Sequence, residues 1–235
     1  APQHSNVLPS EVLTSTSLSN NLNLKIPLIS SAMDTVTESK MAIAIAKEGG
    51  IGVIHRNLSI AQQISEIKRV KTKGLKVGAA VGTSEKEFDR VKNIINSNID
   101  LIVVDTAHGH SERVANIILK IKKIKSKKTA LCAGNIATAE AATFLSKLGV
   151  DVVKVGIGPG SICTTRLVAG IGVPQLSALL DVKKGLAKNI KMISDGGIKF
   201  SGDIAKALAT GADAVMVGSM LAGTSETPGK IIKKK

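Results

Sequence analysis

The sequence predicts an α/β protein whose parallel strands close into a (β/α)8 barrel. Eight short apolar runs recur along the chain, and seven longer amphipathic segments separate them. Strands that are apolar throughout are typical of a parallel sheet buried on both faces, and eight strand–helix units make a TIM barrel. The chain has 235 residues, 43% of them hydrophobic, which suits one domain of this size. We therefore expect residues 1–235 to form a single barrel domain.

The expected strands are the apolar runs themselves. They cover residues 26–32, 51–54, 76–81, 101–105, 129–134, 152–155, 192–195 and 214–217. Helices are expected to begin near Glu38, Ile60, Ser84, Ser111, Thr138, Pro174 and Ser201. An internal repeat supports the barrel, because residues 148–156 parallel residues 210–218: each has a helix end, a Gly turn, a strand and a final Gly.

Three segments depart from a regular barrel. The first 26 residues lack a clear hydrophobic period and are expected to form an extended N-terminal arm. Residues 218–235 contain no further long amphipathic segment, so the eighth helix is expected to be missing. Residues 71–74 leave only a short connector between the second helix and the third strand.

The charge balance is strongly basic. Lys and Arg number 32 against 18 Asp and Glu, giving a formal net charge of +14 at pH 7. Such a balance could indicate a nucleic-acid-binding surface. However, the lysines are spread over helix-like segments, and aromatic residues, which stack on bases, make up 1% of the chain. We interpret the charge as a solvated surface that helps attract anionic nucleotides, and we expect no nucleic acid at the active site.

The chain is expected to be soluble and cytoplasmic, with no membrane partner. No apolar run approaches the roughly 20 residues of a membrane span, and no signal peptide opens the sequence. The two cysteines, Cys132 and Cys163, show neither metal-ligand spacing nor a disulfide framework. A reducing compartment fits this pattern.

A glycine-rich segment at residues 155–166 is the main candidate for a functional loop. It reads Val-Gly-Ile-Gly-Pro-Gly-Ser-Ile-Cys-Thr-Thr-Arg and follows the strand expected at 152–155. Its glycines permit left-handed torsions, so backbone N–H or C=O groups could converge on a phosphate or a cation. Cys163 lies near its tip, either as an incidental buried thiol or as a nucleophile.

This loop resembles the active-site loop of inosine 5'-monophosphate (IMP) dehydrogenase and, more loosely, that of guanosine monophosphate (GMP) reductase. The resemblance covers nearly the whole chain, with matching motifs at residues 31–38, 54–57, 105–110, 134–138, 195–197 and 218–219. It implies an NAD-dependent oxidoreductase that converts IMP to xanthosine 5'-monophosphate through a covalent cysteine adduct, in de novo guanine nucleotide synthesis. It also implies a homotetramer.

The resemblance assigns roles to residues of the expected barrel rim. Cys163 matches the nucleophile that attacks C2 of the purine, and Thr165 matches a residue at the reacting base. The positions that match substrate contacts are Ser31, Met33, Ser161, Asp195, Gly197, Gly218 and Ser219. Asp195 matches the ribose ligand, while the serines and glycines of the late loops match phosphate contacts.

Cofactor and metal positions follow from the same resemblance. Asp105, Thr106 and Asn135 match positions that approach or organise NAD+. A potassium ion is implied on the backbone carbonyls that match Gly158, Gly160 and Cys163. We expect no transition metal at His108 and His110, because the sequence supplies no evident third ligand. No Gly-x-Gly-x-x-Gly motif opens a helix after the first strand, so NAD+ is expected over the barrel rim.

Two alternative functions stay open at this point. GMP reductase shares the loop but uses NADPH, although residues 54–57 and 105–110 favour the dehydrogenase. The other alternative is a nucleotide-binding core with impaired turnover. Family members continue after the last strand into a mobile flap with an Arg-Tyr pair, and many carry regulatory CBS modules where residues 71–74 stand here.

Overall fold

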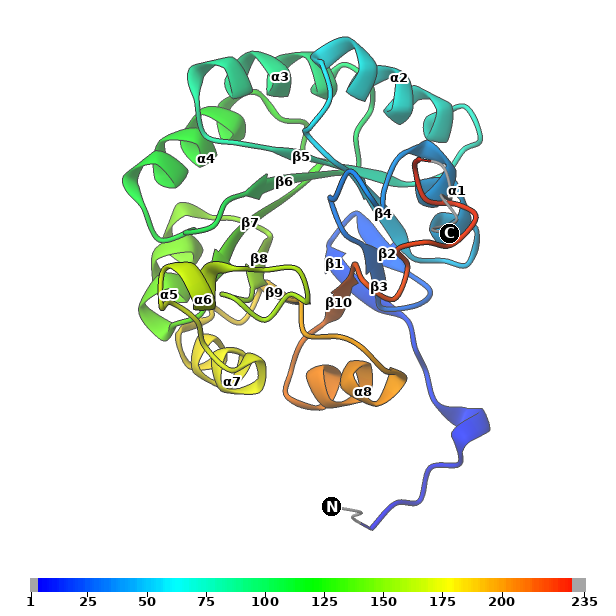
Figure 1. The fold of residues 1–235 in the computed structure, drawn as a ribbon, viewed down its shortest axis with the longest axis vertical. Helices are drawn as coiled ribbons and strands as arrows, with labels where there is room; N and C mark the ends of the chain where they lie inside the picture. The colour runs from blue at the N-terminus through cyan, green and yellow to red at the C-terminus, as the bar shows by residue number, and fades with distance from the viewer. Residues whose placement is uncertain (1–3, 230–235) are drawn as a thin grey trace, which may run out of the picture.

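The computed structural model describes residues 4–229 and contains a closed barrel of eight parallel strands (Figure 1). The order around the barrel is β10-β3-β4-β5-β6-β7-β8-β9, so consecutive strands are neighbours and the last strand closes on the first. The barrel strands are β3 (Leu28–Ser30), β4 (Ile51–Ile54), β5 (Val77–Val81), β6 (Leu101–Asp105), β7 (Ala130–Ile136), β8 (Val152–Val155), β9 (Lys191–Asp195) and β10 (Ala214–Val217). The predicted fold class and all eight predicted strands are confirmed.

Helices surround the barrel, and the seven predicted ones begin within one residue of the expected positions. They are α1 (Ser39–Lys47), α2 (Ile60–Lys71), α3 (Glu85–Ile95), α4 (Glu112–Ile124), α5 (Ala139–Leu148), α7 (Gln175–Gly185) and α8 (Ser201–Ala209). Side-chain caps explain three of these starts, because Ser59, Ser84 and Thr138 accept hydrogen bonds from backbone N–H groups three residues ahead. A further short helix, α6 (Thr165–Val168), was not predicted and lies within the glycine-rich loop.

The core has two layers, one inside the barrel and one between the barrel and its helices. Successive side chains of a strand point to opposite faces, and β8 shows the result. Val152 packs in the interior cluster, whereas Val153 and Val155 pack in the outer cluster beneath the helices. This alternation turns the side chain at position 154 toward the inside of the barrel.

A β-hairpin closes one end of the barrel. It consists of β1 (Thr16–Ser19) and β2 (Leu22–Leu24), paired antiparallel. Leu18, Leu22 and Leu24 are buried and belong to the same cluster as the barrel-interior side chains. The expectation of an extended arm is therefore wrong for the hairpin, whose leucines cover apolar surface that the open barrel would expose.

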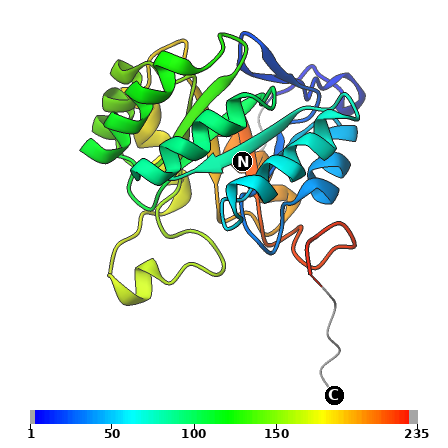
Figure 2. The ribbon, with the colours of Figure 1, turned by 90° about the horizontal axis from the view of Figure 1, so that it is seen from above.

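The hairpin and the glycine-rich loop lie at opposite ends of the barrel. Figure 2 shows the blue hairpin at one end and, at the other, the yellow-green loop that carries α6 together with the red segment after β10. Parallel strands all end at the same edge, so the residues that follow them converge at the end away from the hairpin. That end is where barrel active sites are assembled.

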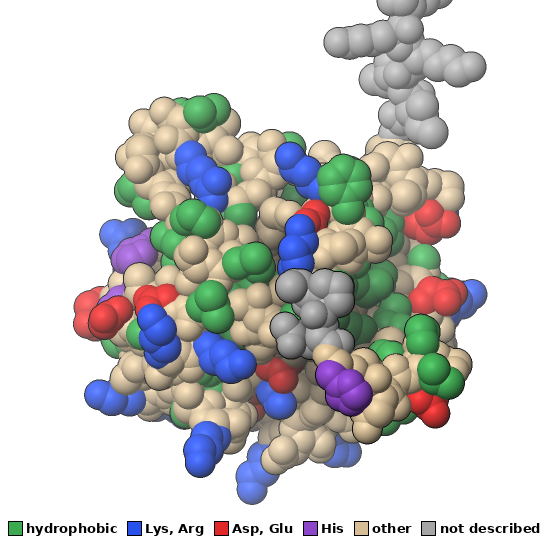
Figure 3. Space-filling model, turned by 90° about the horizontal axis from the view of Figure 1, so that it is seen from below, with side chains coloured by type: hydrophobic (Ala, Val, Ile, Leu, Met, Phe, Trp, Pro, Cys, Tyr) green, Lys and Arg blue, Asp and Glu red, His purple; other side chains and the backbone are tan. Residues whose placement is uncertain are grey.

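The segment after β10 forms turns, with no helix in residues 218–229. The rest of the expected C-terminal segment, residues 230–235, lies outside the described residues. None of the helices within residues 4–229 combines the length and the apolar character needed to cross a bilayer. On the face drawn in Figure 3, Lys and Arg side chains lie scattered among apolar and neutral ones, in keeping with a solvated basic surface.

Leu22→Ala is expected to lower the free energy of unfolding by about 2–5 kcal/mol, because it removes a fully buried side chain from the base of the barrel. Denaturant unfolding followed by circular dichroism measures this loss. Leu13→Ala is the matched control, since Leu13 is 88% exposed in the same N-terminal region and should change stability by less than about 0.5 kcal/mol. Equal effects of the two variants would show that the hairpin does not seal the core.

Candidate active site

Two adjoining cavities open at the end of the barrel away from the hairpin. The first, of about 350 Å³, lies over the ends of β6 to β9, and the second, of about 290 Å³, lies over β9 and β10. Ser31, Met33, Asp195 and Met216 line both cavities. The first also contains Asp105, Thr106, Asn135, Gly158, Cys163 and Thr165, and the second contains Gly160, Ser161, Gly197, Gly218 and Ser219. Every residue that the sequence analysis placed in the site therefore lines one of these cavities.

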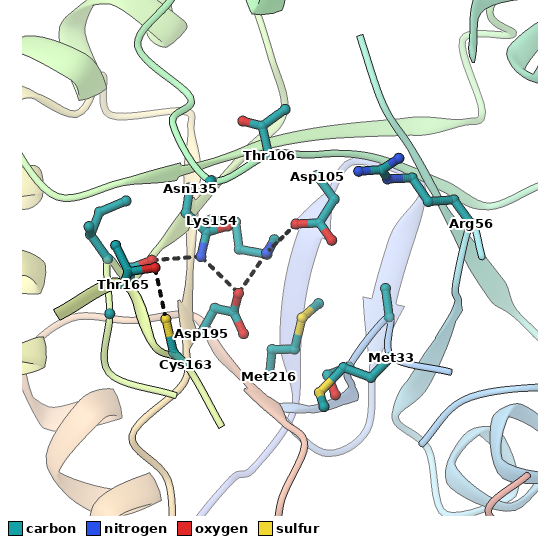
Figure 4. A pocket seen from close by; sticks show the side chains of 16 residues that line it. Met33, Arg56, Asp105, Thr106, Asn135, Lys154, Cys163, Thr165, Asp195 and Met216 are labelled. Carbon is teal, nitrogen blue, oxygen red and sulfur yellow. Dashed lines mark hydrogen bonds and ion pairs between the residues drawn. The ribbon is translucent and has the colours of Figure 1, made fainter. Parts of the chain in front are cut away.

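Cys163 faces the first cavity from the glycine-rich loop. Its Sγ lies 3.2 Å from the Oγ1 of Thr165, at the start of α6 (Figure 4). Hydrogen bonds from the Thr165 hydroxyl and backbone lower the pKa of the Cys163 thiol below its usual value, with a smaller opposite effect of burial. The arrangement favours the thiolate, which is the nucleophilic form of cysteine.

Thr165→Val is expected to raise the pKa of Cys163, because it removes the hydroxyl that stabilises the thiolate. The midpoint of the pH profile for alkylation by iodoacetamide should shift to higher pH, and alkylation at neutral pH should slow. Thr164→Val is the matched control, since Thr164 makes no side-chain cap to α6. An unchanged profile in Thr165→Val would contradict the assignment.

Cys132 has the opposite environment. It lies on β7 inside the barrel and is fully buried. Burial raises its pKa to about 12, although the nearby Lys154 ammonium lowers it in part. Cys132 is therefore a neutral core thiol, and Cys163 is the reactive one of the two.

Lys154 lies at the centre of the site and was missed by the sequence analysis. Its ammonium nitrogen lies 2.8 Å from Asp105 Oδ1 and 2.6 Å from Asp195 Oδ2, so it joins carboxylates on β6 and β9 (Figure 4). Burial lowers the pKa of Lys154, but the two carboxylates raise it by more, so the side chain is charged. The only signal in the sequence is a lysine within the apolar run Val152–Val155.

Asn135 holds Asp195 from the other side. Its Nδ2 donates to Asp195 Oδ2 at 2.9 Å and to the carbonyl of Gly156 at 2.7 Å. Both side-chain contacts of Asp195 use Oδ2, which leaves Oδ1 to accept hydrogen bonds from a ligand. Asn135 Oδ1 is buried without a hydrogen-bond partner among the described residues, as is Ser31 Oγ. Buried polar atoms of this kind are normally satisfied, so both are suited to a bound polar molecule.

The second cavity brings together the serine hydroxyls and the glycines that were expected to contact a phosphate. Ser161 Oγ and Ser219 Oγ, from the loops after β8 and β10, lie 3.3 Å apart. Gly197 has a φ of +77°, which other residues rarely adopt. A side chain at Gly218 would begin 2.9 Å from Ser31 Oγ and 3.1 Å from Met33 Sδ, so only glycine keeps the backbone open to the cavity. Hydroxyls and free backbone amides in a concave site are typical of phosphate recognition.

One family model matches the full length of the sequence. The family model for the IMP dehydrogenase / GMP reductase domain matches residues 1–235. The chain belongs to the IMP dehydrogenase / GMP reductase family.

Relatives of known name agree with this assignment. The chain is 46% identical to an inosine-5'-monophosphate dehydrogenase of Borreliella burgdorferi, over 98% of this chain and 70% of that protein. It is 46% identical to the inosine-5'-monophosphate dehydrogenase of Cryptosporidium parvum, over 97% of this chain and 67% of that protein. It is 37% identical to the inosine-5'-monophosphate dehydrogenase of Bacillus subtilis, over 97% of this chain and 73% of that protein. The first alignment spans 282 residues, more than the 235 of this chain, so that relative carries residues for which this chain has no counterpart. Family membership makes the protein an oxidoreductase of the IMP dehydrogenase type.

The donors expected for potassium are suited to such an ion. Neutral carbonyl oxygens favour a large monovalent cation, and the carbonyls of Gly158, Gly160 and Cys163 belong to one loop. Gly160 O accepts a hydrogen bond from the Cys163 amide at 3.1 Å, which leaves its second lone pair for a cation. Within residues 4–229 no group of three or more His, Cys, Asp or Glu side chains is placed to hold a metal ion.

The residues expected for NAD+ suit the ribose of a dinucleotide. Asp105 uses Oδ1 for Lys154, so Oδ2 can accept a hydroxyl. Thr106 Oγ1 donates its hydrogen to the carbonyl of Gly134 at 2.7 Å. The same oxygen can therefore only accept a hydrogen bond from a ligand. A third cavity of about 480 Å³ adjoins the first at Asp105 and is lined by His55, Arg56 and Asn57. This family motif, which the sequence analysis noted without a role, borders the space where the rest of a dinucleotide could extend.

Proposed function

We propose that this protein oxidises IMP to xanthosine 5'-monophosphate with NAD+ as the hydride acceptor, a step of de novo guanine nucleotide synthesis. The observation that carries the proposal is the position of Cys163, whose activated thiol lines the cavity next to the Ser161 and Ser219 anion site. A nucleotide with its phosphate against the two serine hydroxyls would have its base in the neighbouring cavity, where the thiol lies.

The proposed reaction has two halves that share one cysteine. The Cys163 thiolate adds to C2 of the purine, which makes C2 tetrahedral. The hydrogen on C2 then leaves as a hydride, which restores the double bond of the purine ring at C2 while the C2–S bond remains. Bound NAD+ would supply the acceptor for that hydride. Water then adds to C2 and the C–S bond breaks, which releases xanthosine 5'-monophosphate and returns the thiolate.

The other residues of the site bind and orient the reactants. Asp195 Oδ1 accepts hydrogen bonds from the ribose diol, and the Ser31 hydroxyl and Met33 side chain face the base. The phosphate is bound by Ser161, Ser219 and the backbones of Gly197 and Gly218. Thr165 keeps the Cys163 thiol in its reactive form.

The cofactor side of the site has its own set of residues. Asp105, Thr106 and Asn135 would hold the nicotinamide ribose of NAD+ beside the substrate. A potassium ion on the carbonyls of Gly158, Gly160 and Cys163 would order the loop that carries the nucleophile. We also propose a homotetramer, which sedimentation velocity would test directly.

Absorbance of NADH at 340 nm tests the reaction. The chain is mixed with IMP, NAD+ and potassium, and in parallel with GMP and NADPH. NADH formation from IMP supports the proposal, whereas NADPH consumption with GMP would assign the chain to the reductase activity. Nucleotide binding without either reaction would leave a binding core, the alternative that the sequence analysis kept open.

A further inference from the structure

We propose that Lys154 is a positioning residue that joins the substrate-binding and cofactor-binding halves of the site. Through its two ion pairs it fixes Asp195 toward the nucleotide ribose and Asp105 toward the nicotinamide ribose. The inference rests on the proposed function, because that function gives the two carboxylates their ligands.

The geometry makes Lys154 the shared partner of both carboxylates. Its ammonium lies 2.8 Å from Asp105 and 2.6 Å from Asp195, so one cation bridges the strands β6, β8 and β9. The lysine side chain is only 4% exposed, whereas the carboxylates are 30% and 20% exposed on the cavity side. Lys154 lines the same cavity but is almost covered, so the two carboxylates are the groups more open to a ligand.

The surrounding strands are built to admit this side chain. Gly134 on β7 pairs with Lys154 on β8, and a side chain at Gly134 would begin 2.7 Å from the Cβ of Lys154. Only glycine at that position leaves room for the lysine beside β7. Asn135 adds a second fixed contact to Asp195 Oδ2, so the same carboxylate oxygen is held twice and the other stays available.

The charges around the pair favour a cation between the two carboxylates. Without Lys154 they would lie near each other as like charges with no cation between them, which disfavours the doubly ionised pair. The other titratable or charged groups nearby are Cys132 on β7, which is neutral, Arg56 and Cys163, which line the same cavity, and Asp34 and His55, which line the adjoining one. None of these makes an ion pair with Asp105 or Asp195 in the described residues.

Lys154→Met tests the proposal, because it keeps the length of the side chain and removes its charge. IMP affinity is measured by calorimetry between pH 6 and pH 9, and the NAD+ KM by steady-state kinetics. We expect the IMP dissociation constant and the NAD+ KM each to rise by about tenfold or more at neutral pH, since both ligands lose an ordered ionised acceptor. The ratio of variant to wild-type IMP dissociation constants should fall as pH rises, because IMP binding requires the proton to leave the pair. Taking this ratio at each pH cancels the titration of the nucleotide phosphate.

The double variant Lys154→Met with Asp105→Asn is the charge-matched control. It has the same net charge at this cluster as the wild type, since one cation and one carboxylate are removed together. IMP affinity should recover toward the wild-type value, and the ratio of its dissociation constant to that of the wild type should no longer change with pH. The NAD+ KM should stay high. A role in packing alone would give a loss that is independent of pH and is not recovered in the double variant.

The outcomes separate a failure of this proposal from a failure of the proposed function. Affinities within twofold of the wild type in Lys154→Met, or a loss that does not depend on pH, would overturn the proposal. If Lys154→Met does not fold, Lys154→Gln, which keeps a hydrogen-bond donor without the charge, is measured against the same expectations. Wild-type protein that binds no IMP would refute the proposed function instead, so the two failures are distinguishable.

Discussion

Cys163→Ala is expected to abolish covalent capture of the nucleotide while IMP binding stays measurable. The variant lacks the sulfur proposed to attack C2, whereas the proposed contacts at Ser219 and Asp195, to the phosphate and the ribose, come from other loops than that of Cys163. Intact-mass analysis after incubation with IMP and NAD+ should show an adduct on the wild-type chain and none on the variant. Calorimetry on the same samples checks that IMP still binds.

Cys132→Ala is the matched control for this experiment. Cys132 is the other thiol of the chain, buried in the barrel with its pKa raised to about 12, so its removal should leave the adduct unchanged. An adduct that persists in Cys163→Ala would rule out Cys163 as the nucleophile. An adduct that disappears in Cys132→Ala would show that the buried thiol contributes to capture.

Asp195→Ala is expected to raise the IMP dissociation constant by about ten- to a hundredfold. The carboxylate offers a charge-assisted hydrogen bond to the ribose diol, and such a bond contributes roughly 1.5–3 kcal/mol. Folding should change less than binding, because Lys154 keeps its ion pair with Asp105. Calorimetry measures the affinity and denaturant unfolding measures the stability.

Asp89→Ala is the control, since Asp89 is an exposed carboxylate on α3 whose side chain is 62% accessible. It should leave IMP affinity within twofold of the wild type. Unchanged IMP affinity in Asp195→Ala would refute the assignment of Asp195 as the ribose ligand.

The barrel could be predicted because its signals are local. Its strands are buried on both faces, so each appears as an uninterrupted apolar run, as at residues 101–105. Its helices begin where a short polar side chain can cap the backbone, as at Ser84 and Thr138. The hairpin at residues 16–24 was missed although Leu18, Leu22 and Leu24 flank an Asn-Asn turn, because its leucines alternate with Ser and Asn and form no uninterrupted apolar run.

The candidate site could be predicted where its residues lie at the carboxyl end of a strand. Asp105, Asn135 and Asp195 belong to motifs at strand ends, and closure of the barrel brings them to one cavity. Lys154 could not be found in this way, because a single lysine in an apolar strand has no local explanation. Its role depends on partners from β6 and β9, which only the closed barrel places beside it.

The hairpin that closes the base of the barrel also limits how molecules reach the site. Leu18, Leu22 and Leu24 are buried at that end, and both cavities open on the opposite rim. In the proposed reaction, substrate, cofactor and the water that hydrolyses the adduct would therefore all reach the site from the rim.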